Sequence, residues 1–372
     1  MAIVERVVKQ IPQETLAAMV GAGHEQVVFC HDAASGLRGI IAIHNTTLGP
    51  ALGGIRMRPY PTEAEALEDV LRLSRAMTFK SAAAGLDLGG GKSVIIAGPD
   101  QKSEALFRAM GRFIHSVGGR YIAATDVGTT VDDLTFVRAE TPHVTGLPEE
   151  WGGLGDTSVL TGLTVYLGMK AGAEAMWGSE SLAGKRVVVQ GAGKVGRYLM
   201  SHLRDEGAEI FIADVNGDAA AYAAEHLGAR VVPPEDVLDI DCDILSPNAL
   251  GGVFDDQTIL RVRAPLVCGG ANNQLTEPRH GEALQQRGIL YVPDYVVNSG
   301  GVISAFCEIH HAPRARAEQM AARVGDTTRR ILARARSEGI APSTAADREA
   351  TERIERMAAV HRPYLAGDLR QS

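Results

Sequence analysis

The sequence predicts an α/β protein that folds into two domains. The chain has 372 residues, which is enough for two full hydrophobic cores. Short apolar segments typical of buried strands alternate along it with segments of helical periodicity. The pattern changes after residues 151–155, where a strand–helix–strand unit follows, so we expect a second domain there.

The composition restricts the classes of function. The apolar fraction of 45% and the charged fraction of 22% are ordinary for a soluble enzyme. A net charge of −8 argues against nucleic acids and anionic membranes as partners. Residues 1–6 lack the apolar segment of a signal peptide, and no apolar run approaches the roughly 20 residues that span a bilayer.

The four cysteines indicate the redox environment. Cys30, Cys242, Cys268 and Cys307 are widely scattered and do not have the spacing of metal ligands. We therefore expect no metal site, buried free thiols, and a reducing, cytoplasmic location.

The first domain is expected to mix strands and helices. Residues 26–30 and 37–44 are typical of paired strands, and residues 47–54 of a glycine-rich loop. The capping box that begins at Thr62 predicts a helix, and this helix carries Lys80 at its C-terminal end. Ser103 predicts the start of the next helix.

Residues 77–93 are the centre of the prediction, because they hold two lysines a dozen positions apart. Lys92 follows three glycines, and a lysine held by such a loop can point into a cleft, lose hydration and have its pKa lowered. Lys92 is therefore a candidate base, and Lys80 a candidate anion clamp. The alternative is a surface turn with two solvated lysines. A phosphate-binding P-loop is excluded, because Leu86 replaces the required glycine and a strand follows instead of a helix.

Asp126 is a second candidate catalytic residue. It stands where the apolar strand 121–124 ends and a glycine-bearing turn begins, which is where catalytic side chains are often displayed. The alternative is that Asp126 caps the helix expected over residues 130–137.

Residues 185–214 carry a dinucleotide-binding fingerprint. A strand over residues 185–190 precedes a G-x-G-x-x-G sequence that opens a helix, and the next strand, residues 209–213, ends at Asp214. The predicted cofactor contacts in the turn and first helical residues are Gly191, Ala192, Gly193, Lys194, Val195, Gly196 and Arg197. Asp214 can bond the ribose hydroxyls and would repel a 2′-phosphate, so we expect NAD rather than NADP.

Three further short strands are predicted, over residues 243–245, 264–268 and 289–292. The loops that follow them contain Asn248, the pair Asn272 and Asn273, and Asp294. Ligands of open α/β sheets bind at such carboxyl ends. The two adjacent asparagines have an alternative role as caps of a helix or turn. Long helices are expected over residues 314–336 and 347–360.

The chain resembles the glutamate/leucine/phenylalanine/valine dehydrogenase family, and its branched-chain members most closely. Seven stretches over most of the chain carry this resemblance: residues 49–54, 77–80, 85–92, 126–129, 249–252, 271–274 and 293–302. The family implies reversible oxidative deamination, in which an L-amino acid, NAD and water give a 2-oxo acid, ammonia and NADH.

The resemblance also implies roles for single residues. Lys80 would hold the substrate carboxylate, Lys92 would activate the attacking water, and Asp126 would exchange protons with the amino group. Thr161 and Asn273 would contact the nicotinamide and the substrate. The matched side-chain pocket consists of Leu52, Ala124, Val302 and Ala305, and Gly53 is a further substrate contact.

The family architecture places a substrate domain in residues 1–147, joined by residues 340–372, and a Rossmann-type NAD domain in residues 148–339. The active site would lie in the cleft between them, and hinge closure would expel water. A homo-oligomer is expected.

Two positions depart from the branched-chain pattern. Asn248 replaces a cysteine near the cofactor, and Ala305 replaces a larger aliphatic residue in the side-chain pocket. The smaller Ala305 leaves an aromatic, phenylalanine-type substrate as a second possibility. A non-catalytic NAD-binding module and a hydroxy-acid dehydrogenase are rival functions, although the histidines show no signature of the latter.

Overall fold

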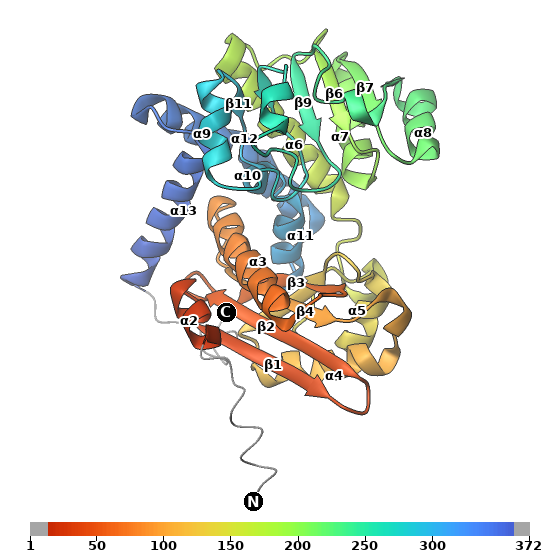
Figure 1. The fold of residues 1–372 in the computed structure, drawn as a ribbon, viewed down its shortest axis with the longest axis vertical. Coiled ribbons are helices and arrows are strands. Elements are labelled where there is room, and N and C mark those ends of the chain that lie inside the picture. Colours follow the sequence, from red (N-terminus) through yellow and green to blue (C-terminus); the bar gives the residue numbers. More distant parts are fainter. Residues whose placement is uncertain (1–13, 361–372) are drawn as a thin grey trace, which may run out of the picture. The chain divides into compact units, whose positions relative to one another are not determined.

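The structure is a computed structural model that describes residues 14–360 (Figure 1). Residues 1–6, on which the expectation of no signal peptide rests, and the end of the predicted segment 340–372 lie outside this range. The chain divides into two compact units. Within the described range, the first unit comprises residues 14–78, 87–147 and 357–360, and the second comprises residues 79–86 and 148–356.

The first unit is built on a five-stranded mixed sheet. Its strands are β1 (Gln26–Asp32), β2 (Leu37–Asn45), β3 (Ala51–Arg58), β4 (Gly89–Ile96) and β5 (Tyr121–Thr125), in the order β1-β2-β4-β3-β5. The β1–β2 hairpin, which pairs Gln26 with Ile43, confirms the predicted hairpin. β2 and β4 are antiparallel, whereas β3 is parallel to both β4 and β5.

The helices of the first unit cover both faces of this sheet. They are α2 (Glu14–Gly21), most of α3 (Glu63–Ala83), η1 (Pro99–Gln101), α4 (Glu104–Ser116) and α5 (Val131–Arg138). Ile41 and Ile55 face a core that contains Phe107 of α4, whereas Ile40 and Val94 face α3. The side chains of neighbouring strand residues point to opposite faces, so one sheet supports two cores.

The predicted loops at residues 47–54 and 89–91 are wrong in part. Residues 51–54 belong to β3, and residues 89–91 belong to β4, so Lys92 lies within a strand. The glycines serve close packing here. A Cβ at Gly53 would collide with the Gly91 carbonyl oxygen of the neighbouring strand, and one at Gly90 would collide with the Thr78 amide of α3.

The helix caps show which of the predicted residues serve to start a helix. Ser103 Oγ accepts the Leu106 amide at 3.2 Å, which confirms the predicted cap of α4. The cap of α5 is Thr130, whose Oγ1 accepts the Asp133 amide at 3.2 Å. Asp126 is therefore not the cap of this helix, and its position has a different cause.

The second unit is built on a six-stranded parallel sheet. Its strands are β6 (Arg186–Gln190), β7 (Glu209–Ala213), β8 (Arg230–Val231), β9 (Ile244–Pro247), β10 (Leu266–Val267) and β11 (Leu290–Tyr291). The order β11-β10-β9-β6-β7-β8 is that of a doubly wound dinucleotide-binding sheet. The strand order reverses between β6 and β9, which confirms the predicted Rossmann-type fold for this part of the chain.

Helices surround the second sheet (Figure 1). They are η2 (Glu149–Trp151), α6 (Ser158–Trp177), α7 (Lys194–Glu206), α8 (Gly217–Leu227), η3 (Pro234–Asp236), η4 (Thr258–Arg261), α9 (Arg279–Gln286), α10 (Asp294–Val297), α11 (Gly300–Ile309), α12 (Arg314–Glu338) and α13 (Pro342–Ala358). Gly339 caps α12 in the left-handed conformation. The last helix begins five residues earlier than predicted.

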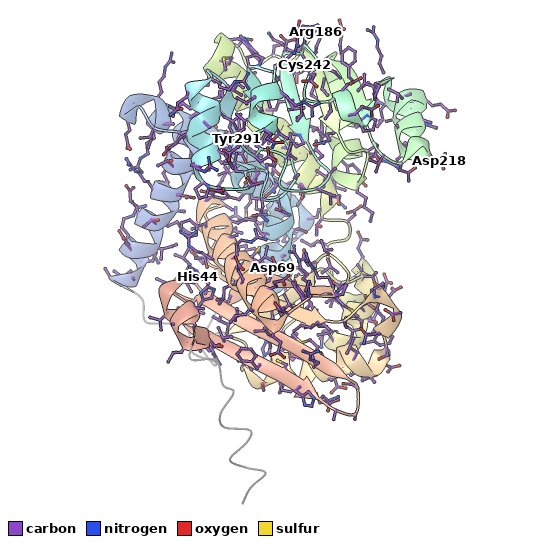
Figure 2. The ribbon with its side chains drawn as sticks, in the orientation of Figure 1. His44, Asp69, Arg186, Asp218, Cys242 and Tyr291 are labelled. Atoms are coloured by element: carbon purple, nitrogen blue, oxygen red, sulfur yellow. The ribbon has the colours of Figure 1, made fainter. Side chains whose placement is uncertain are left out.

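The thiols follow the prediction. All four cysteines are buried and free, and Cys242 is labelled in Figure 2. Among the helices described, none is long and apolar enough to cross a bilayer.

Candidate active site

The site in the first unit is built around a buried ion pair between Lys92 and Asp126. Lys92 Nζ lies 2.8 Å from Asp126 Oδ2, and the two side chains are 8% and 18% exposed. Lys92 comes from the middle of β4, and Asp126 from the turn after β5. The structure thus brings together two residues that are 34 positions apart and that the sequence analysis singled out separately.

The turn after β5 fixes the position of Asp126. The Asp126 backbone amide donates to Thr129 Oγ1 at 2.9 Å, and the Thr129 hydroxyl donates to the Ile55 carbonyl of β3 at 2.8 Å. These two bonds tie the turn to the neighbouring strand. The carboxylate is therefore presented at the end of a core strand, as predicted.

Arg56 and Asp69 complete the charged cluster, and the sequence analysis missed both. Arg56 Nε lies 2.9 Å from the same Asp126 Oδ2, and Arg56 Nη1 lies 3.0 Å from Asp69 Oδ2. The Tyr60 hydroxyl donates to Asp69 at 2.8 Å, and Arg72 reaches Asp69 at 2.9 Å. Asp69 is labelled in Figure 2.

The pKa values of the pair are shifted in the direction that base catalysis requires. Burial lowers the pKa of the Lys92 ammonium, attraction to Asp126 opposes this, and repulsion from Arg56 adds to it. Burial alone would raise the pKa of Asp126, but Lys92, Arg56 and the Val127 amide outweigh it and lower the pKa. Asp126 is thus ionised, and burial makes the remaining proton of the pair, on Lys92, easier to lose.

Lys80 belongs to a separate polar cluster in the second unit. Its Nζ donates to Asn272 Oδ1 at 2.7 Å, and Asn298 Nδ2 donates to the same oxygen at 2.8 Å. Asn298 lies at the end of α10 and also donates to the Gly270 carbonyl at 3.2 Å. Asn298 is a further residue to which the sequence analysis gave no role.

Asp294 and Asn273 shape the loop that presents Asn272. Asp294 is buried at the start of α10 and accepts the Gln274 amide at 2.9 Å. Burial raises the pKa of Asp294, against the attraction of Lys80 and the bonds from this loop. Asn273 has a φ of 53°, and its carbonyl accepts the Gly252 amide at 2.7 Å. Asn273 therefore supports the loop through its backbone, while its side chain remains a candidate contact.

The fingerprint turn has the geometry that a pyrophosphate requires. Gly191 has a φ of 104°, and a Cβ at Gly196 would collide with the Gly191 carbonyl oxygen, so helix and strand meet at two glycines. A Cβ at Gly193 would have no atom within 4 Å, so the N-terminus of α7 is open in front of this residue. The turn therefore fits a dinucleotide.

The acid at the end of β7 is part of the same turn. Asp214 Oδ2 accepts the Ala192 amide at 2.6 Å, and Oδ1 accepts the Asn216 amide at 2.8 Å. A carboxylate has about four lone-pair sites, so both oxygens keep acceptor capacity for ribose hydroxyls. Arg197 braces the turn, since its Nε donates to the Ala192 carbonyl at 2.8 Å and its guanidinium lies over Tyr222.

The remaining predicted cofactor contacts lie near the same sheet edge. Asn248 follows β9 and accepts the Gly270 amide at 2.8 Å, so it links the ends of β9 and β10. Val195 lies next to Gly270, and Lys194 is 3.5 Å from Asp156 on the surface. Thr161 is buried on α6, close to Gly301 at the start of α11. These positions surround the point where the strand order reverses.

Comparison with known proteins agrees with both halves of this description. The family model described as the dimerisation domain of Glu/Leu/Phe/Val dehydrogenases matches residues 24–143, and the model of glutamate/leucine/phenylalanine/valine dehydrogenases matches residues 212–361. The chain belongs to the glutamate/leucine/phenylalanine/valine dehydrogenase family. It is therefore an amino acid dehydrogenase.

Individual relatives in this dehydrogenase family cover nearly the whole chain. A leucine dehydrogenase of Geobacillus stearothermophilus is 51% identical over 92% of this chain and 94% of its own length. A valine dehydrogenase of Streptomyces virginiae is 50% identical over 89% of this chain and 94% of its own. The crystal structure of L-tryptophan dehydrogenase from Nostoc punctiforme has a TM-score of 0.82 and 41% identity, and covers 92% of this chain and 99% of its own.

The residues predicted to line the side-chain pocket of this dehydrogenase belong to two units. Leu52 and Gly53 are buried in β3, and Ala124 is half-buried in β5. Val302 and Ala305 are buried in α11 of the second unit. Each set is apolar, and neither contributes a charged group.

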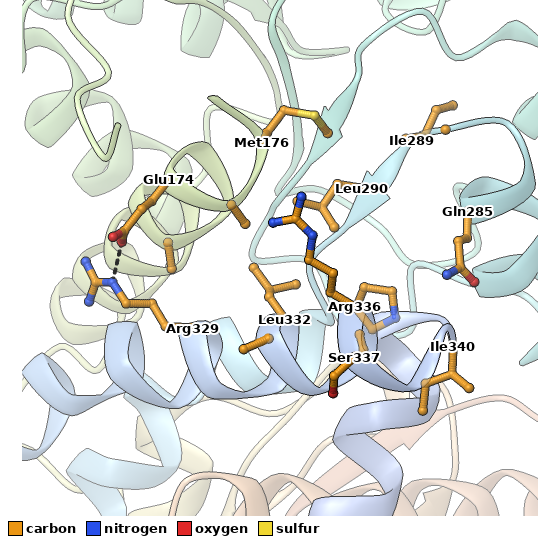
Figure 3. Close-up of a pocket in the computed structure, with 16 residues that line it drawn as sticks. Glu174, Met176, Gln285, Ile289, Leu290, Arg329, Leu332, Arg336, Ser337 and Ile340 are labelled. Carbon is orange, nitrogen blue, oxygen red and sulfur yellow. Dashed lines mark hydrogen bonds and ion pairs between the residues drawn. The ribbon is translucent and has the colours of Figure 1, made fainter. Parts of the chain in front are cut away.

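A cavity of about 640 Å³ in the second unit lies away from all these residues (Figure 3). It is lined by α6, α12 and residues 285–290, and the ion pair between Glu174 and Arg329 borders it. Residues 288–290 enter β11 at its amino end, whereas dinucleotides bind at the carboxyl ends of such strands. We therefore do not assign this cavity to the dehydrogenase reaction.

Proposed function

We propose that this dehydrogenase catalyses the reversible, NAD-dependent oxidative deamination of a branched-chain L-amino acid. An L-amino acid, NAD and water give a 2-oxo acid, ammonia, NADH and a proton. The observation that carries the proposal is the buried pair of Lys92 and Asp126, in which the pKa of the lysine is lowered. Identities of 50–51% to leucine and valine dehydrogenases support the substrate class.

Lys92 is the proposed general base. Because burial lowers its pKa, it gives up its proton more readily and can then accept one from the water that attacks the imine carbon of the substrate. Asp126 lies 2.8 Å away and exchanges protons with the amino group and the departing ammonia. NAD, when bound, accepts the hydride from the α-carbon.

Lys80 is the proposed partner of the substrate carboxylate. Its ammonium has Asn272 Oδ1 as an acceptor at 2.7 Å, and a carboxylate would be a stronger one because it is charged. Asn298 holds Asn272 from the other side, so the amide can stay in place when the lysine turns to the substrate. Asn273 and Thr161 complete the proposed contacts to nicotinamide and substrate.

NAD is the proposed cofactor, bound by residues 191–197 at the start of α7. Asp214 is held by the Ala192 amide next to that helix N-terminus, where it can accept bonds from ribose hydroxyls. The same carboxylate would repel a 2′-phosphate, and residues 215–217 contain no arginine to neutralise one. Asn248 is proposed to border the nicotinamide side.

An aromatic substrate is the second candidate. Ala305 leaves space in the pocket relative to a larger aliphatic residue, and a solved L-tryptophan dehydrogenase is 41% identical to this chain. Both candidate functions exclude acidic and basic amino acids as substrates, because the four pocket residues offer no partner for a buried charge.

A homo-oligomer and a cytoplasmic location complete the proposal. The match of residues 24–143 to a dimerisation domain supports self-association, and the buried free thiols suit a reducing compartment. Analytical ultracentrifugation of the purified chain tests the first point, since a monomer at micromolar concentration would contradict it.

A substrate panel tests the proposed reaction. The purified chain is mixed with NAD and single L-amino acids, and NADH absorbance is followed. L-leucine, L-valine and L-isoleucine should be oxidised, and their 2-hydroxy analogues should not. Oxidation of the hydroxy analogues alone would indicate a hydroxy-acid dehydrogenase, and no turnover with any amino acid would indicate a non-catalytic module.

A further inference from the structure

Arg56 occupies a position in the site that the proposed chemistry has not yet used. Its Nε and the Nζ of Lys92 both contact one oxygen, Asp126 Oδ2, at 2.9 and 2.8 Å. The Arg56 side chain is 15% exposed. The two cations therefore share one carboxylate oxygen of Asp126.

A general base must spend part of its cycle without its proton. When Lys92 becomes neutral, Asp126 loses one of its two cationic partners while it remains buried. A buried carboxylate that is left with no cationic partner is strongly disfavoured. A site made of Lys92 and Asp126 alone would therefore hold the proton on the lysine.

A guanidinium removes this difficulty because it does not lose its proton in proteins. We propose that Arg56 is a positioning residue that remains as the permanent counterion of Asp126, so that Lys92 can give up its proton without leaving that carboxylate unpaired. The inference rests on the proposed function, since it explains how the proposed base becomes neutral.

Asp69 makes the arrangement specific for arginine. It holds Nη1 of Arg56 at 3.0 Å while Nε holds Asp126, so one planar group bridges two carboxylates. The Tyr60 hydroxyl and Arg72 in turn hold Asp69. With Lys92 neutral, Arg56 and Arg72 balance Asp69 and Asp126, so loss of the proton takes the cluster from a net charge of +1 to neutrality.

The charged and titratable groups that face Lys92 come from three elements. They are Arg56 of β3, Asp69 of α3, and Asp126 in the turn after β5. Arg56 lowers the pKa of Lys92 and Asp69 raises it. The two residues must therefore shift the titration of Lys92 in opposite directions when they are neutralised, which misfolding alone would not do.

The test measures the protonation of Lys92 directly. The intact chain is treated with acetic anhydride over a range of pH, and the acetylation of Lys92 is followed by mass spectrometry. Arg56→Met should move the midpoint to higher pH by about one unit or more, which is about tenfold less neutral lysine at a given pH. Asp69→Asn should move it to lower pH.

Two further variants complete the design. Arg38→Met removes an exposed arginine that pairs with Glu63 in the same unit, and should leave the midpoint unchanged. Arg56→Lys keeps the positive charge but cannot bridge both carboxylates. Its labelling midpoint should therefore lie close to that of the unaltered chain, while kcat should recover only in part. In every variant, the low-pH limb of the pH profile of kcat/KM should shift by the same amount as the midpoint of Lys92 acetylation.

The inference fails if folded Arg56→Met keeps the midpoint of the unaltered chain, or if both Arg56→Met and Asp69→Asn move it in the same direction. Circular dichroism establishes that each variant is folded. Because labelling reads Lys92 without turnover, an unaltered chain that oxidises no amino acid would contradict the proposed function while the midpoints still decide the role of Arg56.

Discussion

At the scale of residues, the charged cluster shows what a sequence motif can and cannot reveal. Lys92 and Asp126 were predicted because glycines and a strand end surround them. Arg56 has no such signal, and residues 47–54 just before it were interpreted as a loop. The parallel register that pairs Ile55 with Thr125 is what brings Arg56 beside Asp126. A correct prediction of β3 would have suggested the contact.

The first prediction concerns Asp126. Asp126→Asn keeps the shape of the side chain but removes the charge that pairs with both cations, so we expect turnover to fall by about 10²–10⁴-fold through loss of the proton exchanger. Asp132→Asn, in the exposed first turn of α5, is the matched control and should keep full turnover. Initial-rate kinetics with L-leucine and NAD measures both. Equal rates in the two variants would show that Asp126 has no part in proton exchange.

The second prediction concerns two buried histidines that contact α3. His24 Nε2 lies 2.8 Å from Ser74 Oγ, and His44 Nδ1 lies 2.8 Å from Thr78 Oγ1. Burial, together with repulsion from His24 and Arg75, lowers the pKa of His44 to about 3, and burial also lowers that of His24. Figure 2 labels His44.

The sign of the effect follows from proton uptake on unfolding. In the unfolded chain a histidine binds a proton below a pH of about 6.5, whereas in the folded chain these two stay neutral. The free energy of unfolding is therefore fully present above that pH, and it falls as the pH drops toward the pKa values of the folded chain. Each histidine contributes up to about 1.4 kcal/mol per pH unit in this window. Urea unfolding of the unaltered chain, His44→Gln and the exposed control His226→Gln measures it. A profile as steep in His44→Gln as in the control would contradict the prediction.

At the scale of elements, most strands and several amphipathic helices were predicted, whereas the largely buried helix α6 was not. α6 has no polar face to set a helical period, because residues on several sides pack against α7, α11 and α12. The glycines of β3 and β4 suggested loops, although they serve close packing between neighbours. In both cases tertiary packing overrides the local preference that a sequence pattern reports.

The third prediction tests the packing of the fingerprint turn. A methyl group at Gly196 would collide with the Gly191 carbonyl, so Gly196→Ala should destabilise the second unit by about 1–3 kcal/mol and weaken NADH binding. Gly217, at the start of α8, has no atom within 4 Å of a built Cβ. Gly217→Ala is the matched control and should be neutral or slightly stabilising. Thermal unfolding and NADH titration follow both, and similar behaviour of the two variants would refute the packing argument.

At the scale of the whole molecule, the proposed reaction needs residues from both units. Lys92 and Asp126 belong to the first unit, whereas Lys80, the fingerprint turn and α11 belong to the second. The sequence motifs singled out each set separately. The departure at Ala305 is likewise visible in the sequence.

The fourth prediction concerns substrate choice. Ala305→Val adds two methyl groups to the proposed pocket, so the ratio of kcat/KM for L-phenylalanine to that for L-valine should fall, by about 10–200-fold per methylene of lost fit. Val360→Ala, an exposed position, is a control that should leave the ratio unchanged. An unchanged ratio in Ala305→Val would show that this residue does not line the pocket, and a preference for L-glutamate would overturn the pocket assignment.

The central claim is that Lys92 is the base of an amino acid dehydrogenase, and the turnover of Lys92→Ala tests it most directly. The variant is compared with Lys185→Ala, just before β6, with L-leucine and NAD as substrates and NADH binding as the test of integrity. We predict that Lys92→Ala binds NADH normally while kcat falls by about 10²–10⁴-fold, and that Lys185→Ala is unaffected. If Lys92→Ala keeps more than about a tenth of the turnover, Lys92 is not the general base.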